Sequence, residues 1–293
     1  MHQYLLHNQK LHETKDALLS PGQVGFMNGW GVFSTLRVAK GVLFAFERHF
    51  RRMRRDADLL RVPFCYEAEE LSESLLKLVE ANRAFDATLR VAVVRNKGNL
   101  FQSPGIKRET DLIAFTADLT RWPVRAKLGY MPNARFGACP FAGTKVTSWA
   151  QNLAWYETAH ARGLDEFVLL NEDGRISECT SANIFIIRGD QVLTPPITTS
   201  GCLPGVTRAI LLEEIDLPAV RFSEAELSPS DLEEADQVFI CSTTRELLPV
   251  GEIDGEPLKQ NPELLQELQQ AFTLYQEKYI STHSSRTREP LAV

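Results

Sequence analysis

The sequence lacks a long apolar run, and this absence excludes one class of protein. Its longest uninterrupted apolar stretch is Val42–Phe46, whereas a membrane-spanning helix needs roughly 18 or more consecutive apolar residues. The first residues also lack the pattern of a secretory signal, which is a basic segment followed by an apolar one. We therefore expect no membrane partner and a cytoplasmic location.

Cysteine is scarce as well. The chain of 293 residues has five cysteines, an odd number without C-x-x-C spacing. Disulfide frameworks use paired cysteines, and zinc sites use closely spaced cysteine and histidine ligands. His2, His7 and His12 recur every five residues, which suits neither one helical face nor a zinc signature. We expect free thiols, in keeping with a reducing cytoplasm, and no metal site.

Positive charge is in deficit too. Lysine and arginine number 32 against 38 acidic residues, so the formal net charge is −6. A nucleic-acid binder usually carries a basic stripe, and we expect no nucleic-acid partner. One segment runs against this average, because residues 48–55 hold five arginines: Arg48, Arg51, Arg52, Arg54 and Arg55. Taken as charge alone, the cluster indicates either an anion-binding face or a solvated helix surface.

The length predicts two domains, since a domain typically has about 150 residues. Apolar residues at helical spacing predict helices over 47–60, 69–83, 147–162, 207–214 and 262–279. Apolar runs predict strands over 26–38 and 42–46, joined by the turn Lys40-Gly41. We expect a small N-terminal α/β domain over 1–120, a connector over 121–134, a larger domain over 135–281 that carries Lys145, and a frayed tail over 282–293.

Several motifs with a general chemical meaning are absent. The sequence has no G-x-x-x-x-G-K-[ST], no G-x-G-x-x-G after a strand, no G-x-S-x-G and no H-E-x-x-H. These absences exclude the ordinary nucleotide-binding, hydrolase and metalloprotease classes.

Two ionisable residues stand out among the remaining patterns. Lys145 lies in the uncharged window FAGTKVTSWAQN, where desolvation can turn a lysine into a nucleophilic amine. The alternative is a lysine with an exposed tip. Glu178 opens the apolar stretch of RISECTSANIF, where its carboxylate is either paired with a cation or exposed on a hairpin. Taken alone, each residue favours the structural role.

Two further segments offer hydrogen-bond donors. Gly205-Val206-Thr207 opens a predicted helix, and the backbone N–H groups at such a position bind phosphate. Ser242-Thr243-Thr244 ends a predicted strand and supplies hydroxyl groups. Alone, each segment is also compatible with an ordinary helix cap or turn.

Taken together and in order, these pieces resemble the class IV, or fold type IV, pyridoxal-phosphate aminotransferase family. That family includes branched-chain aminotransferases, D-amino acid aminotransferases and aminodeoxychorismate lyases. The resemblance covers roughly residues 4–275. It rests on G-x-G-V-F at Gly29–Phe33, His49-x-x-Arg52, Lys145, DGRISECTSANIF, TPPITTSGCLPGVTR and CSTTRELLPV. It implies an α/β (α+β) fold of two domains, pyridoxal 5'-phosphate in the cleft between them, and a homodimer.

The resemblance also implies roles for particular residues. Lys145 would form the Schiff base with the cofactor aldehyde and then shuttle a proton. Glu178 would accept a hydrogen bond from the pyridinium nitrogen, which keeps the ring an electron sink. The cofactor phosphate would be bound by a set of donors from both domains: Arg52, the backbone of Val206 and Thr207, Ser242 and Thr243. The substrate would meet a second set: Phe33, Thr35, Arg90 and Thr244.

The reaction itself remains open between alternatives. The preferred one is amino-group transfer between a branched-chain or related hydrophobic amino acid and a 2-oxo acid such as 2-oxoglutarate. Thr35 resembles a lyase residue and keeps open the release of pyruvate from aminodeoxychorismate, with formation of 4-aminobenzoate. A D-amino acid or amine transaminase is less favoured, because the loop over 96–102 lacks the arginine and histidine of D-specific members. The presence of both Lys145 and Glu178 disfavours a non-catalytic protein that has kept the fold.

Overall fold

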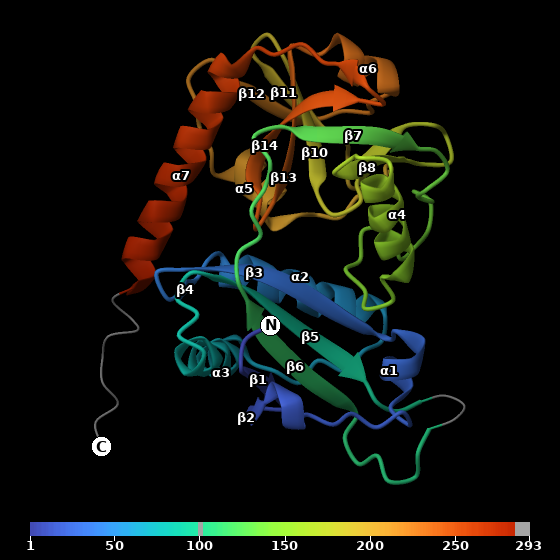
Figure 1. The fold of residues 1–293 in the computed structure, drawn as a ribbon, viewed down its shortest axis with the longest axis vertical. Helices are drawn as coiled ribbons and strands as arrows, with labels where there is room; N and C mark the ends of the chain where they lie inside the picture. Colours follow the sequence, from blue (N-terminus) through green and yellow to red (C-terminus); the bar gives the residue numbers. More distant parts are fainter. Residues whose placement is uncertain (99–101, 285–293) are drawn as a thin grey trace. The chain divides into compact units, whose positions relative to one another are not determined.

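The computed structural model describes residues 1–98 and 102–284. Its backbone divides into two compact units, which we describe separately (Figure 1). Of the described residues, unit 1 comprises those within Met1–Thr120, Thr144–Trp149 and residues 276–284, and unit 2 comprises Arg121–Gly143 and Ala150–Tyr275. Residues 144–149, which were predicted to lie in the second domain, are thus grouped with unit 1.

Unit 1 is built on a six-stranded antiparallel sheet with the order β2-β1-β6-β5-β3-β4. The predicted turn at Lys40-Gly41 joins β3 to β4. The strands are β1 (Tyr4–His7), β2 (Lys10–Glu13), β3 (Gly31–Ala39), β4 (Val42–Leu43), β5 (Ala87–Arg95) and β6 (Thr110–Ala117). A 3-10 turn (Thr14–Asp16) follows β2, and the short helix α1 (Val24–Asn28) precedes β3. The predicted strand over 26–38 is therefore wrong before Gly31.

Helices α2 (Phe46–Leu59) and α3 (Ala68–Ala81) lie against this sheet (Figure 1). Alternate residues of the central strands, such as Leu36 and Leu89, point into the core that the helices cover, because successive strand side chains face opposite sides. The helices contribute residues at helical spacing, among them Met53, Leu75 and Leu78. The other face of the same strands carries Thr35 and Arg90, which are paired in register.

Residues 144–149 extend this sheet at the edge of β3. Val146 forms an isolated bridge with Val32, and hydrogen bonds run from the N–H of Phe33 to the Lys145 carbonyl and from the N–H of Thr147 to the Gly31 carbonyl. Because the backbone is extended here, the predicted helix over 147–162 begins later, as α4 (Ala150–Ala161).

Unit 2 contains a nine-stranded mixed sheet with the order β12-β11-β10-β13-β14-β7-β8-β9, and β15 pairs with β14. Strands β8, β9, β10 and β13 are almost entirely buried. The strands are β7 (Ala126–Met131), β8 (Glu166–Leu170), β9 (Ile176–Cys179), β10 (Asn183–Arg188), β11 (Gln191–Thr194), β12 (Arg221–Glu224), β13 (Gln237–Ser242), β14 (Glu246–Ile253) and β15 (Glu256–Pro257).

Besides α4, three helices occur in this part of the chain: α5 (Val206–Glu213), α6 (Pro229–Glu234) and α7 (Pro262–Ser284). Helix α7 continues past the predicted end at 279, and its residues from Gln276 onward are grouped with unit 1. The predicted frayed tail begins within this helix, and its residues 285–293 lie outside the described residues. In the described ranges, none of the helices has both the length and the apolar character that a membrane span needs.

Gly29 offers a test of how residues 144–149 are attached to unit 1. This residue ends α1 with a φ of 61°, and a Cβ added to it would lie 2.7 Å from both Cα and Cβ of Ser148. Gly163 has a similar φ of 73° but no atom within 4 Å of an added Cβ. Gly163→Ala should cost only the backbone strain, about 1 kcal/mol. Gly29→Ala should cost clearly more in the free energy of unfolding, measured by urea denaturation. Equal losses would show that the contact with Ser148 is not tight.

Candidate active site

Helix α2 turns three polar side chains toward the sheet. His49 is 1% exposed, Arg52 is 8% exposed and Asp56 is fully buried. Buried polar groups need partners, and Ser34 on β3 supplies one. The Arg52 Nη2 atom donates to Ser34 Oγ at 2.8 Å, and Ser34 Oγ lies 2.8 Å from His49 Nδ1. Arg52 is thereby distinguished from the neighbouring arginines at 51, 54 and 55, which are exposed.

Lys145 is held against this cluster by its backbone. Its N–H donates to the Asp56 carboxylate at 3.0 Å, and its carbonyl accepts from the Phe33 N–H at 3.0 Å. The half-buried side chain places Nζ 4.8 Å from the centre of the Phe33 ring. Burial, together with the positive charges of Arg52 and Lys145, holds the pKa of His49 well below its usual value. The imidazole is therefore neutral beside two cations.

A second cation shares the aromatic surface that Lys145 uses. The Arg90 guanidinium carbon lies 4.7 Å from the centre of the Phe33 ring and 6.0 Å from that of Trp149. Burial lowers the pKa of Arg90, but a guanidinium remains charged in proteins. No carboxylate of the described residues forms an ion pair with it. Phe33, Thr35 and Arg90 thus share one face of the sheet, next to Lys145.

In unit 2, Glu178 on β9 is 9% exposed and both of its carboxylate oxygens have partners. Oε1 accepts from Nε and Nη2 of Arg135 at 3.3 and 3.2 Å, and Oε2 accepts from the Leu203 N–H at 3.1 Å. The Arg135 guanidinium in turn lies 5.4 Å from the centre of the Trp155 ring. The geometry fixes the carboxylate in position.

Helix α5 begins beside the strand that follows Glu178. Asn183 Nδ2 donates to the Leu203 carbonyl at 2.8 Å, and a Cβ on Gly205 would lie only 2.0 Å from Asn183 Oδ1. A larger residue at position 205 would therefore displace the Asn183 amide. The next N–H groups, of Val206 and Thr207, lie in the first turn of the helix, where they have no intrahelical acceptor. Asn183 is also paired in register with Cys241, the residue before Ser242.

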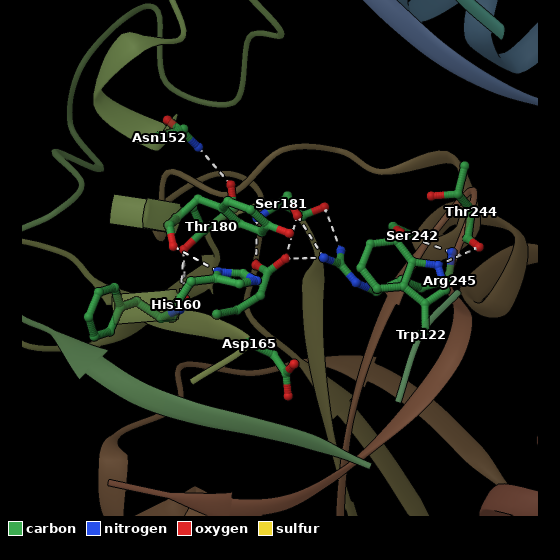
Figure 2. A network of polar contacts seen from close by, with 12 residues as sticks. Trp122, Asn152, His160, Asp165, Thr180, Ser181, Ser242, Thr244 and Arg245 are labelled. Carbon is green, nitrogen blue, oxygen red and sulfur yellow. Dashed lines mark hydrogen bonds and ion pairs between the residues drawn. The ribbon is translucent and has the colours of Figure 1, made fainter. Parts of the chain in front are cut away.

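The turn after β13 is held by a buried ion pair, shown in Figure 2. Arg245 donates to the fully buried Glu166, and Ser181 donates to the same carboxylate through its N–H and its hydroxyl. The Arg245 guanidinium also lies 3.9 Å from the centre of the Trp122 ring, whose Nε1–H donates to the Thr244 carbonyl at 3.0 Å. The Arg245 N–H donates to Ser242 Oγ at 3.3 Å. These contacts hold Ser242, Thr243 and Thr244 in one turn.

The structure thus brings the predicted residues together in two groups, one in each unit. Unit 1 holds Arg52, Lys145, Phe33, Thr35 and Arg90. Unit 2 holds the second group: Glu178, Val206, Thr207, Ser242, Thr243 and Thr244.

The residues that position these groups were not predicted from the sequence. Arg135 and Trp122 lie in the predicted connector or just beyond it, and no local pattern ties them to Glu178 or to Thr244. Asn183 and Arg245 lie inside the motifs RISECTSANIF and CSTTRELLPV. A polar side chain next to an apolar strand was the feature of the sequence that could have indicated them. The loop over 96–102, which lacks the arginine and histidine of D-specific members, lies partly outside the described residues, at 99–101.

Comparison with known proteins identifies the family. The family model described as amino-transferase class IV matches residues 31–253, so the chain belongs to the class IV aminotransferase family. A protein of Methanocaldococcus jannaschii, provisionally assigned as a branched-chain-amino-acid aminotransferase, is 29% identical over 283 residues, covering 90% of this chain and 93% of that protein. A D-alanine aminotransferase of Bacillus licheniformis is 26% identical over 258 residues, covering 87% and 89%.

Solved structures show the same fold. The Escherichia coli branched-chain amino acid aminotransferase is 23% identical with a TM-score of 0.85, covering 94% of this chain and 95% of that one. The branched-chain amino acid aminotransferase of Thermobaculum terrenum, solved in its pyridoxal-phosphate form, is 21% identical with a TM-score of 0.81, covering 96% and 94%. A Legionella pneumophila protein provisionally assigned as a 4-amino-4-deoxychorismate lyase is 22% identical with a TM-score of 0.81, covering 89% and 96%. The predicted fold type IV class is confirmed.

Pyridoxal 5'-phosphate is the cofactor of this family, and the residues present fit it. A dianionic phosphate needs cationic and N–H donors. Unit 1 offers Arg52 and the buried Nε2 of His49, which has no hydrogen-bond partner among the described residues. Unit 2 offers the first turn of α5, and Glu178 offers a fixed carboxylate to a protonated ring nitrogen.

Arg52 can be tested as a ligand of the cofactor phosphate by substitution. Arg52→Ala should weaken cofactor binding at least tenfold, because a hydrogen bond to a charged group contributes about 1.5–3 kcal/mol. Arg54→Ala should leave the affinity within about twofold, since Arg54 is exposed on the same helix. Arg55→Ala should also have the smaller effect, but Arg55 pairs with Asp56, which makes Arg54 the cleaner control. Equilibrium dialysis monitored by cofactor absorbance would measure these affinities, and equal losses for Arg52 and Arg54 would contradict the assignment.

The hydrogen bond from Trp122 to the turn of Figure 2 can be tested in the same way. Trp122→Phe keeps an aromatic ring beside Arg245 but removes the N–H that donates to Thr244. We expect a two- to tenfold weaker affinity for the cofactor or substrate, in line with a net hydrogen-bond contribution of about 0.5–1.5 kcal/mol. Trp122→Leu removes the ring contact as well and should have the larger effect. If Trp122→Phe matches the wild type in KM and in cofactor affinity, this hydrogen bond does not position the turn.

Proposed function

We propose that this enzyme is a pyridoxal-phosphate-dependent aminotransferase that moves an amino group between a branched-chain or related hydrophobic amino acid and a 2-oxo acid. The observation that carries the proposal is the placement of Lys145. The fold holds this amine over the Phe33 ring, near His49, and the same ring contacts the Arg90 guanidinium, which has no carboxylate partner among the described residues. The match to the class IV family and the branched-chain relative support the same reaction.

Lys145 is the catalytic base and acid in this proposal. When bound, pyridoxal phosphate supplies an electron sink that lowers the barrier to proton loss at the substrate α-carbon. Lys145 would hold the cofactor through its primary amine. Once a substrate amine has displaced it, the released amine would take that proton and return it, which an arginine could not do near neutral pH. Glu178, fixed by Arg135 and by the Leu203 N–H, accepts the hydrogen bond of the ring nitrogen.

The remaining proposed contacts divide between phosphate and substrate. Arg52, the backbone of Val206 and Thr207, Ser242 and Thr243 bind the cofactor phosphate. Arg90 is the proposed partner of the substrate carboxylate, because it is a half-buried cation without a carboxylate partner in the described part of the chain. Phe33 offers an apolar surface to the substrate side chain, and Thr35 and Thr244 complete the contacts.

The role of Lys145 is tested by chemical trapping. Borohydride reduction of the purified yellow protein should leave the cofactor covalently attached to the peptide that contains Lys145, as read by mass spectrometry after digestion. Lys145→Arg keeps the charge but should abolish both the labelling and the activity. Label on a different lysine would refute the assignment.

The reaction is tested with substrates. Leucine or valine mixed with 2-oxoglutarate should give glutamate, whereas Arg90→Met should raise the amino acid KM at least tenfold through the loss of a charge-assisted bond. A panel that includes D-alanine tests the other relatives, one of which is a D-alanine aminotransferase. Glutamate from D-amino acids alone would replace the proposed substrate class.

A lyase is the second candidate, favoured by one observation. Thr35 carries a hydroxyl on the sheet face next to Arg90, at the position that resembles the lyases, and a provisionally assigned lyase shares the fold. If the protein releases pyruvate and 4-aminobenzoate from aminodeoxychorismate and makes no glutamate, the lyase replaces the aminotransferase. Thr35→Val should then abolish the release of pyruvate.

We also propose that the enzyme is a cytoplasmic homodimer. All five cysteines are free thiols, which suits a reducing compartment. In unit 1, Leu18, Phe26 and Met27 are largely exposed, and apolar side chains gathered near α1 favour association with a second copy. Light scattering should give about twice the chain mass of 33.0 kDa. A monomer would contradict the proposal.

A further inference from the structure

The two ring nitrogens of His49 differ in what they contact. The side chain is 1% exposed, and Nε2 has no hydrogen-bond partner among the described residues. A buried polar atom without a partner is costly and rare in folded proteins. Since Nδ1 faces Ser34, the two nitrogens have different surroundings, and their protonation can be worked out from the neighbours.

Ser34 determines which nitrogen carries the proton. A guanidinium can only donate, so Ser34 Oγ accepts from Arg52 Nη2 at 2.8 Å. Ser34 is fully buried, so its hydroxyl proton needs an acceptor, and among the described residues His49 Nδ1 lies within reach at 2.8 Å. With Nδ1 as the acceptor, a neutral imidazole carries its proton on Nε2. Burial, Arg52 and Lys145 all favour the neutral ring by lowering the pKa of His49.

We propose that Arg52, Ser34 and His49 form a chain of hydrogen bonds that presents the Nε2–H of His49 as a donor to a phosphate group bound beside Arg52. The proposal deepens the proposed function, in which that phosphate belongs to the cofactor; inorganic phosphate offers the same chemistry. Helix α2 places His49 and Arg52 three residues apart on one face.

The protonation state of His49 can be measured directly. In protein labelled with ¹⁵N-histidine, long-range ¹H–¹⁵N correlation spectra distinguish the two neutral tautomers, and comparison with His49→Gln assigns the signal. We expect the neutral Nε2–H form in the holoenzyme. Ser34→Ala removes the hydroxyl that faces Nδ1 and should reduce the share of this tautomer. An Nδ1–H tautomer or an imidazolium at neutral pH would overturn the proposal.

Ligand binding is tested with a matched pair of variants. The Gln amide nitrogen reaches the position of Nε2, whereas the Asn amide reaches only that of Nδ1. His49→Asn should therefore weaken cofactor binding about tenfold, as expected for a hydrogen bond to a charged group, and His49→Gln should stay within about threefold. Both variants lose the ring, so a general loss of packing would affect them alike and overturn the proposal.

Competition by inorganic phosphate identifies the bound group. The proposal expects phosphate to displace the cofactor less effectively from His49→Asn than from His49→Gln. The two variants could differ in their affinity for pyridoxal phosphate and yet be equally sensitive to competition by inorganic phosphate. The hydrogen bond would then go to another part of the cofactor, and the assignment to the phosphate would be overturned.

The glutamate assay on the same proteins separates the two proposals. An enzyme with the expected tautomer and affinities but no glutamate formation overturns the proposed reaction and supports the donor role of His49. Normal transamination with equal affinities in all variants overturns the donor role alone.

Discussion

The pairing of residues 145–147 with the edge of β3 is the contact on which the candidate chemistry depends. The Lys145 carbonyl accepts from the Phe33 N–H and its N–H donates to the Asp56 carboxylate, while the Thr147 N–H donates to the Gly31 carbonyl. Each such bond contributes only about 0.5–1.5 kcal/mol, but together they set the direction of one amine. Because the segment is extended rather than helical, Nζ reaches the Phe33 ring, on the same sheet face as Thr35 and Arg90. Gly29 and Gly31 allow this segment to approach so closely.

Buried charge imposes the second constraint, and each unit satisfies it with a local network. In unit 2, Glu166 and Arg245 are both almost completely buried, and removing one partner of such a pair typically costs about 3–5 kcal/mol. Ser181 and Trp122 complete this pair and extend it to the turn at Ser242–Thr244. Glu178 and Arg135 repeat the pattern. The donors and acceptors that a cofactor would use are thus positioned by partners that never need to touch it.

Much of this arrangement could be predicted from the sequence, since it rests on local patterns. Helical spacing located α2 and α3 to within a few residues, and the lysine and glutamate stood out by their uncharged or apolar surroundings. Arg52 could be separated from four neighbouring arginines by its motif. Its burial in the structure follows from helical spacing, because Arg52 lies on the buried side of α2 with Phe46, Met53 and Ala57. The predicted helix over 147–162 was wrong only at its start, since α4 begins at Ala150, because strand pairing with β3 outweighed a local helical pattern. Arg135 and Trp122 could not be predicted, since their partners are distant in the chain.

The sequence by itself determined the family and the cofactor, and it singled out the side chains proposed to react, because these are properties of short motifs in a definite order. The tertiary structure alone decided which side chains are neighbours. It placed Ser34 between His49 and Arg52, Arg90 over the ring that Lys145 uses, and the indole of Trp122 against Thr244. The physical reason is that strand register and helix packing bring together residues far apart in the chain, and buried polar groups then bond to whatever partner lies within reach.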